Sequence, residues 1–345
     1  MKSIYLVPLF CSLALVSNAC GTKSAKKIAA IVAAENIGEY GAQSTDEAVS
    51  AASAGDSEGA SGFSLSLSGS GSDSGSPYKT FSRTCAVQAD GSALVTISSE
   101  ISIEKSDSND KVSRTFSRSG TSSEKRTWSH PSGVQCVSDK AKVNLKSDPT
   151  SYGLKVQIER TRKQTMSQTN TKKNTTISSS RSFSMNGERT VAIVSYSEDA
   201  AAGVSTQEKK VTGSMNRSFS FVDKDGATKT GSFSSTTVGD PMVVRVKRSL
   251  SSKEIVSREL VSGTRRNTLS DGSMIDTSFT NFLMTGSGES CQAQSGSLSL
   301  SYLDSEGAVT KSLSCSAESG VLSCTDSSGA SVELESPSCD PADDK

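Results

Sequence analysis

A regular alternation of apolar and polar residues begins soon after residue 78 and restricts what this chain can fold into. Within residues 93–104 the apolar side chains fall on every second position, with Leu94 and Ser99 as exceptions. Successive side chains of a strand point to opposite faces of a sheet, so this pattern predicts a long strand with one apolar and one polar face. Residues 141–145 and 152–158 alternate in the same way. The sequence therefore predicts an all-β fold.

Short dipeptides typical of hairpin turns separate these alternating stretches. Gly, Asn and Asp adopt the positive φ that two-residue turns require. Six such dipeptides are Asp90-Gly91, Asn186-Gly187, Asp225-Gly226, Asp271-Gly272, Glu306-Gly307 and Ser319-Gly320. Asp148-Pro149 predicts a further hairpin, which would pair residues 141–145 with 152–158. We expect an antiparallel meander that forms an open curved sheet, a sandwich or a barrel-like structure.

The composition limits how much core such a fold can bury. Hydrophobic residues make up 33% of the chain and aromatic residues 5%. This favours sheets with one packed and one solvated face. We expect a basic antiparallel β domain over residues 78–290, followed by an acidic, cysteine-containing β module and tail over residues 291–345.

The N-terminus has the three parts of an export signal. Lys2 is followed by an apolar run over residues 4–16, then by small residues at Ser17 and Ala19. The run is too short to span a bilayer. Cleavage after Ala19 would remove residues 1–19.

Cys20, directly after the small residue, resembles the lipobox cysteine of bacterial lipoproteins. The resemblance implies that Cys20 becomes the first residue and carries the lipid, its acyl chains including palmitate. The segment departs from the family pattern at Ser17, where Leu is commonest, and Ser17 with Ala19 would also suit ordinary signal peptidase. Gly21 after the cysteine implies, by the same resemblance, anchoring at the outer membrane of the bacterial cell envelope, on either its periplasmic or its surface side.

Residues 20–77 have the composition of a lipid-anchored tether. Residues 24–36 are rich in Ala and predict a short helix. The remainder is dominated by Ser, Gly, Ala and Asp, which is typical of a flexible linker.

The cysteines support an oxidising compartment. Beyond Cys11 and Cys20, six remain, and an even number in an exported chain predicts disulfides. A two-residue turn at Ser319-Gly320 places Cys315 opposite Cys324, which a disulfide can bridge where the pair is a narrow one. Keeping each further pair within its own module gives Cys85 with Cys136 and Cys291 with Cys339. No C-x-x-C pair occurs, so neither a zinc site nor any other metal or cofactor is predicted.

Charge is balanced overall but segregated along the chain. Residues 77–289 contain 31 Lys+Arg and 21 Asp+Glu, a net of +10, whereas residues 290–345 contain 2 and 9, a net of −7. Either the two regions dock on each other, or the basic region meets an outside anion such as lipopolysaccharide or another acidic envelope polymer. The basic residues of this region include Arg160, Arg162, Lys163, Lys172, Lys173, Lys209, Lys210, Arg245, Lys247, Arg248, Arg265 and Arg266, which are dispersed along it. Aromatic residues do not interleave with them along the sequence, so nucleic acid is not an expected partner.

An Arg-x-Phe sequence recurs without a fixed period. It occurs at Arg114-Thr-Phe116, Arg181-Ser-Phe183 and Arg217-Ser-Phe219, and Phe233 and Phe279 lie in related Ser-Phe segments. We interpret it as half-buried strands, with Phe on the packed face and Ser and Arg facing water.

Short matches to catalytic motifs favour structural explanations. Gly55-Asp-Ser57-Glu-Gly59 lies in the tether, Ser122-x-x-Lys125 lacks its partner motifs, and Asp223-Lys-Asp-Gly226 lacks the acidic residue that ends a calcium loop. His130 is the single histidine and predicts a loop or strand end rather than a metal ligand.

The sequence thus favours a non-catalytic envelope or surface lipoprotein with a binding or structural role. One alternative is a lipid or lipoprotein carrier, which would need a continuous apolar cavity. Another is a cell-wall glycan enzyme, which would need two carboxylates facing each other across a cleft.

Overall fold

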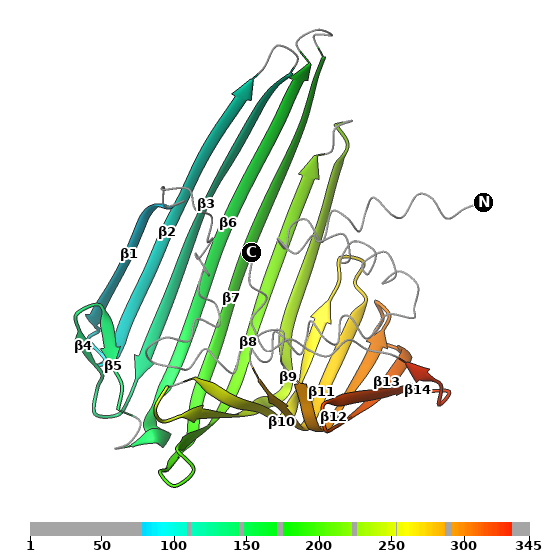
Figure 1. The fold of residues 1–345 in the computed structure, drawn as a ribbon. Helices are drawn as coiled ribbons and strands as arrows, with labels where there is room; N and C mark the ends of the chain where they lie inside the picture. Colours follow the sequence, from blue (N-terminus) through cyan, green and yellow to red (C-terminus); the bar gives the residue numbers. More distant parts are fainter. Residues whose placement is uncertain are drawn as a thin grey trace.

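The computed structural model describes residues 78–108, 112–144, 148–170, 175–222, 226–252, 254–286 and 292–332. Strands dominate this part of the chain (Figure 1). The strands are β1 (Tyr78–Val87), β2 (Ala93–Ser108), β3 (Val112–Ser129), β4 (Gln135–Val137), β5 (Lys140–Lys142), β6 (Gly153–Asn170), β7 (Thr175–Asp199), β8 (Val204–Val222), β9 (Thr228–Ser249), β10 (Ile255–Thr268), β11 (Met274–Thr285), β12 (Gln292–Leu303), β13 (Val309–Glu318), β14 (Val321–Asp326) and β15 (Ser331–Val332). A single 3-10 turn, η1 (Pro149–Ser151), precedes β6.

Thirteen of these strands form one antiparallel sheet. Its order is β1-β2-β3-β6-β7-β8-β9-β10-β11-β12-β13-β14-β15, so each strand pairs with the previous sheet strand in the sequence. The sheet is open, because β1 and β15 lie at its two ends. This confirms the predicted all-β antiparallel meander as an open curved sheet. β12 pairs with β11, so the acidic C-terminal strands continue the sheet of the basic region.

The turn predictions have mixed outcomes. The turns around Gly91, Gly272, Gly307 and Gly320 connect neighbouring strands, and each of these glycines has positive φ. The prediction at Asn186-Gly187 is wrong, because both residues lie inside the 25-residue strand β7. A Cβ on Gly187 would lie 3.0 Å from the carbonyl oxygen of Ser214 on β8, so this glycine permits close approach of two strands.

The hairpin predicted across Asp148-Pro149 is also wrong. β5 pairs with β4, whereas β6 pairs with β3 and β7. Pro149 instead starts η1, and Ser151 donates a 2.8 Å hydrogen bond to Asp148. A proline with its fixed φ suits the first position of such a turn.

Irregular pairings cross the sheet between β8 and β12. The register shifts between Val211 and Ser214 on β8, at three points where β10 pairs with β9, and between Thr280 and Leu283 on β11. Gly239, Gly263, Asn281 and Gly296 have positive φ in this zone. Bulges bend strands and increase their twist. Figure 1 shows the sheet curving here, from the long strands β2–β8 towards the shorter β11–β14.

One face of the sheet contains the core. Leu154, Val191, Val211 and Met242 are directly opposite one another on β6, β7, β8 and β9, and each is at most 2% exposed. The same core cluster also includes Leu260, Phe282 and Leu300 on β10, β11 and β12. The core thus occupies a limited stretch of each strand, and the long strands continue well past it.

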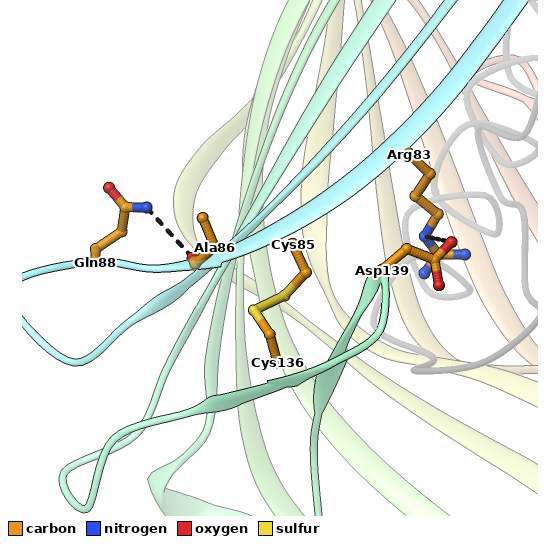
Figure 2. Close-up of a disulfide and its surroundings, with 6 residues drawn as sticks. All are labelled: Arg83, Cys85, Ala86, Gln88, Cys136 and Asp139. Atoms are coloured by element: carbon orange, nitrogen blue, oxygen red, sulfur yellow. Dashed lines mark hydrogen bonds and ion pairs between the residues drawn. A yellow bond between two sulfur atoms is a disulfide. The ribbon is translucent and has the colours of Figure 1, made fainter.

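Two disulfides stabilise the sheet edges. Cys315 and Cys324 are opposite each other on β13 and β14, with Cα atoms 4.0 Å apart, and they are bridged as predicted. The predicted Cys85–Cys136 bridge is also present and joins the β4–β5 hairpin to edge strand β1 (Figure 2). Arg83 and Asp139 form an ion pair of 3.7 Å beside it. Cys20, Cys291 and Cys339 lie outside the described residues.

Candidate binding faces of the long strands

Two chemically different faces extend along β2, β3, β6, β7, β8 and β9. Strand alternation and register together decide which residues share a face. Position 99 on β2 pairs with 122 on β3, and the row continues through 160, 185, 217 and 233. Two more rows follow at steps of two residues, and all three continue the face that carries the core.

We call these three rows the arginine–phenylalanine face. It consists of eighteen residues: Ser99, Ser122, Arg160, Met185, Arg217 and Phe233; Ile101, Gly120, Arg162, Phe183, Phe219 and Gly231; and Ile103, Arg118, Gln164, Arg181, Phe221 and Lys229. Five are Arg, one is Lys, four are Phe and none is acidic. The six cationic side chains are all half-buried. Such a face is positive and partly apolar.

The Arg-x-Phe recurrence explains how this face is built. Residues two apart on a strand point the same way, so Arg181 and Phe183 share a face, as do Arg217 and Phe219. The expectation that Arg faces water while Phe packs inwards is therefore wrong. The guanidinium of Arg181 lies 5.3 Å from the ring centroid of Phe221, and that of Arg217 lies 5.9 Å from that of Phe233. These cation–π contacts order the arginine side chains over the rings.

Phe219 lies against the backbone of the neighbouring strand. It pairs with Gly231, and a Cβ on Gly231 would overlap the Cζ, Cε1 and Cε2 atoms of the Phe219 ring. Because Gly231 has no Cβ, the Phe219 ring can pack directly against the backbone of β9. The ring occupies the middle of the three rows, with Arg217 and Phe221 on either side along β8.

The opposite face of the same strands is covered by hydroxyl groups. Two neighbouring rows are Glu100, Thr121, Thr161, Ser184, Ser218 and Ser232, and Ser102, Ser119, Lys163, Ser182, Ser220 and Thr230. Five residues of each six are Ser or Thr. Their side chains also bond to each other, with 2.8 Å between the hydroxyls of Thr121 and Thr161 and 2.7 Å between those of Ser184 and Ser218. We call this the hydroxyl face.

A shallow hollow of about 860 Å³ follows these two hydroxyl rows across the six strands. The row between them, from Ile101 to Gly231, and Ser270 in the turn before β11 also line it. The lining of the hollow thus combines many Ser and Thr residues with Ile101, Phe183 and Phe219.

Other basic residues serve the structure of the sheet. Arg245 donates hydrogen bonds of 2.9 Å to Glu208 and 2.6 Å to Glu259, and these carboxylates raise its pKa, chiefly through the bond to Glu208. Arg266 donates two bonds of 2.7 Å to Asp276, which raise the pKa of Arg266. These ion pairs join neighbouring strands.

Arg265 is buried next to the bulge of β8. Its side chain is 6% exposed and donates hydrogen bonds of 2.8 Å to the hydroxyl of Ser235 and 3.2 Å to the carbonyl of Gly213. It also donates to the hydroxyl of Thr237 at 3.3 Å. The guanidinium thus satisfies polar groups where β8 and β9 change register. Lys209, with 0% exposure, is the largest fully buried side chain among the described residues.

Several other residues singled out in the sequence do not form a common site. Lys163 belongs to the hydroxyl face, and Lys172, Lys173 and Asp225 lie outside the described residues. Ser122 and Lys125 are three apart on β3 and therefore point to opposite faces, which excludes their acting together in catalysis.

His130 belongs to the loop after β3. Its ring stacks against Tyr152 at 4.4 Å between centroids, and its Nδ1 accepts a 3.1 Å hydrogen bond from the backbone N–H of Ser132. In the described ranges no three His, Cys, Asp or Glu side chains gather in a way that could hold a metal ion. His130 therefore stabilises a loop, as its sequence context predicts.

Neither a protein-family model, a curated protein nor a solved structure matches this chain. Within the described residues no helix has the length and apolar character needed to cross a bilayer.

Sequence reasoning missed the arginine–phenylalanine face because its members are scattered over more than a hundred residues. The signal that could have found it is the Arg-x-Phe spacing itself, since a step of two keeps both side chains on one face of a strand.

Proposed function

We propose that this protein is a non-catalytic lipoprotein of the bacterial cell envelope that binds an anionic envelope polymer on its arginine–phenylalanine face. The observation that carries the proposal is the composition of that face. Six cationic side chains and no acidic one lie within three adjacent rows on six strands. Charges of one sign on a shared surface attract ligands of the opposite sign and speed their capture.

Position along the strands favours binding over core formation. The row from Ser99 to Phe233 still contains buried residues such as Met185, whereas the rows from Ile101 to Gly231 and from Ile103 to Lys229 contain none. Guanidinium groups are suited to carboxylate and phosphate groups, which they can contact through two parallel hydrogen bonds. The cation–π contacts hold Arg181 and Arg217 in place before a ligand arrives, which lowers the entropy lost on binding.

The envelope location rests on the N-terminus and on the disulfides. The lipobox-like segment ending at Cys20 supports lipid attachment and outer-membrane anchoring. Two disulfides, Cys85–Cys136 and Cys315–Cys324, suit an oxidising compartment outside the cytoplasm.

The two alternative functions find less support in the described residues. A lipid carrier would need an apolar cavity, whereas the 860 Å³ hollow is lined mainly by Ser and Thr. A glycan-cleaving enzyme would need two carboxylates facing across a cleft, whereas Glu208 and Glu259 both bind the side chain of Arg245 between them.

The proposal is tested by measuring binding of the mature full-length chain to lipopolysaccharide and to an acidic polysaccharide as salt is raised. Exposed charges are screened beyond about 8 Å at 0.15 M salt. Binding should therefore be present at low salt and weaken steeply towards 0.5 M. Failure to bind any acidic polymer at low salt would refute the proposal.

A further inference from the structure

The spacing of the cations on the arginine–phenylalanine face indicates which class of acidic polymer fits it. This inference rests on the proposed function, since it names the class of acidic polymer. We infer that the ligand is a linear polyuronate, an extended glycan with a carboxylate on each sugar, and that it lies across the strands along the middle row from Ile101 to Gly231.

The cations of each outer row occupy alternate strands. In the row from Ile103 to Lys229 they lie on β3, β7 and β9, as Arg118, Arg181 and Lys229. In the row from Ser99 to Phe233 they lie on β6 and β8, as Arg160 and Arg217. The two series are offset by one strand, so the cations alternate between the two sides of the middle row. A polymer along that row meets an outer-row cation at each of the five strands β3, β6, β7, β8 and β9, first on one side and then on the other. The sixth cation, Arg162, lies in the middle row itself.

Strand spacing converts this pattern into a repeat length. Neighbouring strands lie about 4.8 Å apart, so cations on one side recur at about 9.6 Å. One sugar of an extended chain is close to one strand spacing in length. When consecutive sugars are turned by half a revolution, as in a ribbon-like glycan, their carboxylates point alternately to the two sides. The charge pattern of such a polyuronate therefore matches the cation pattern of the face.

The middle row offers the sugar rings a surface to rest on. Phe183 and Phe219 lie next to each other in this row, and glycines occupy it at Gly120 and Gly231. The Phe219 ring lies down over Gly231, as a Cβ at that position would overlap it. The apolar face of a sugar ring packs well on the flat face of an aromatic ring. A chain of phosphates has charge but no ring to place there.

The spacing predicts how affinity depends on ligand length. The face spans the six strands β2, β3, β6, β7, β8 and β9, with one sugar for about each strand. Binding of purified uronate oligosaccharides to the mature protein should strengthen by several-fold for each added pair of sugars up to about six sugars, then level off. Affinity that keeps rising well beyond six sugars, or does not depend on length, would contradict the inference.

A second comparison separates ring stacking from charge. Phe219→Leu keeps an apolar side chain but removes the flat ring. We expect it to weaken binding of the uronate hexamer by about fivefold or more and to leave binding of a polyphosphate of equal charge within twofold of the wild type. The carboxyl-reduced, neutral form of the same glycan should bind at least tenfold more weakly than the acidic form.

These outcomes distinguish the inference from the proposed function. If polyphosphate and polyuronate of equal charge bind equally well, and Phe219→Leu affects both alike, the face binds anionic polymers but does not select uronates. If neither polymer binds at low salt, the proposed function itself is wrong. Equal thermal unfolding midpoints for Phe219→Leu and the wild type would show that any loss arises at the face.

Discussion

The ring of Phe219 covers Gly231 on the neighbouring strand so closely that no other residue fits beneath it. A Cβ at position 231 would overlap three ring atoms, and the φ of Gly231 needs no glycine, so the restriction comes from the ring. Gly231→Ala should therefore displace the Phe219 ring. We expect a loss of about 1 to 3 kcal/mol in the free energy of unfolding, the usual range for overpacking.

Urea unfolding checks this prediction, with Ser232→Ala as the matched control. Ser232 is the next residue on β9 but points to the hydroxyl face and is exposed. That substitution should change stability by less than about 0.5 kcal/mol. Equal stability for the two variants would show that the ring does not depend on Gly231.

The two disulfides should contribute unequally to stability. Their sequence separations are 51 for Cys85–Cys136 and 9 for Cys315–Cys324. A longer closed loop loses more chain entropy, which gives about 4 kcal/mol for the first bridge and about 2.7 kcal/mol for the second. Paired Cys→Ser variants, compared by urea unfolding, should follow this order. The reverse order would indicate that local packing outweighs the entropy of the unfolded chain.

Arg265 should matter far more for stability than its neighbour Arg266. Replacing Arg265 by Met leaves the carbonyl of Gly213 and the hydroxyl of Ser235 without the hydrogen bonds that the guanidinium supplies. Buried polar groups left unsatisfied cost about 1 to 3 kcal/mol each. We expect Arg265→Met to lose about 2 to 4 kcal/mol of unfolding free energy.

Arg266→Met is the control for that change. Arg266 binds Asp276 in a half-buried pair, and such pairs contribute about 1 kcal/mol or less. Thermal unfolding of the two variants under identical conditions decides between them. Similar losses would mean that the buried guanidinium of Arg265 is not a structural requirement.

The sheet could be predicted from the sequence because its signals are local. Period-two alternation and glycine turns identify strands and their order, and the turn at Ser319-Gly320 fixes the register that joins Cys315 to Cys324. The turn predicted at Asn186-Gly187 is wrong, because the dipeptide alone does not distinguish a glycine inside a strand from a glycine in a turn. The reason for Gly187 appears only in the structure, where it lies close to the backbone of Ser214 on the neighbouring strand.

The arginine–phenylalanine face could not be predicted because it depends on register between distant strands. Arg118 and Arg181 are 63 positions apart, and they share a row only because β3, β6 and β7 align residues 118, 164 and 181. A shift of one residue in either pairing would move one of them to the opposite face. Bulges such as that between Val211 and Ser214 change the register within a strand, and no local pattern in the sequence marks them.

Glu188 gives a small, testable contribution to acid stability. Lys155 and Gln157 hydrogen-bond its carboxylate, each at 3.0 Å, and lower its pKa from the ordinary value of 4.5, with Lys155 the larger cause. A lowered folded-state pKa gives stability that is present above pH 4.5 and is lost as the pH falls through the folded value. The side chain is 47% exposed, so we expect about 0.5 kcal/mol or less.

Glu188→Gln should therefore be less stable than the wild type at pH 6 and equally stable near pH 2. Glu159→Gln on the neighbouring strand, which removes the same charge, serves as the control. Urea midpoints at the two pH values check this, and a difference between wild type and Glu188→Gln that persists at pH 2 would contradict the assignment.

We expect binding of the anionic polymer to depend on the arginine–phenylalanine face and not on basic charge in general. Arg162 and Lys163 are consecutive on β6 and therefore point to opposite faces of the sheet, so Arg162→Glu and Lys163→Glu make the same change in net charge on different surfaces. The most direct measurement is the affinity of both variants for an acidic polysaccharide at low salt. We predict that Arg162→Glu binds about tenfold more weakly than the wild type or worse, a difference of about 1.4 kcal/mol, whereas Lys163→Glu stays within about threefold. Equal losses in the two variants, or a greater loss for Lys163→Glu, would contradict the claim.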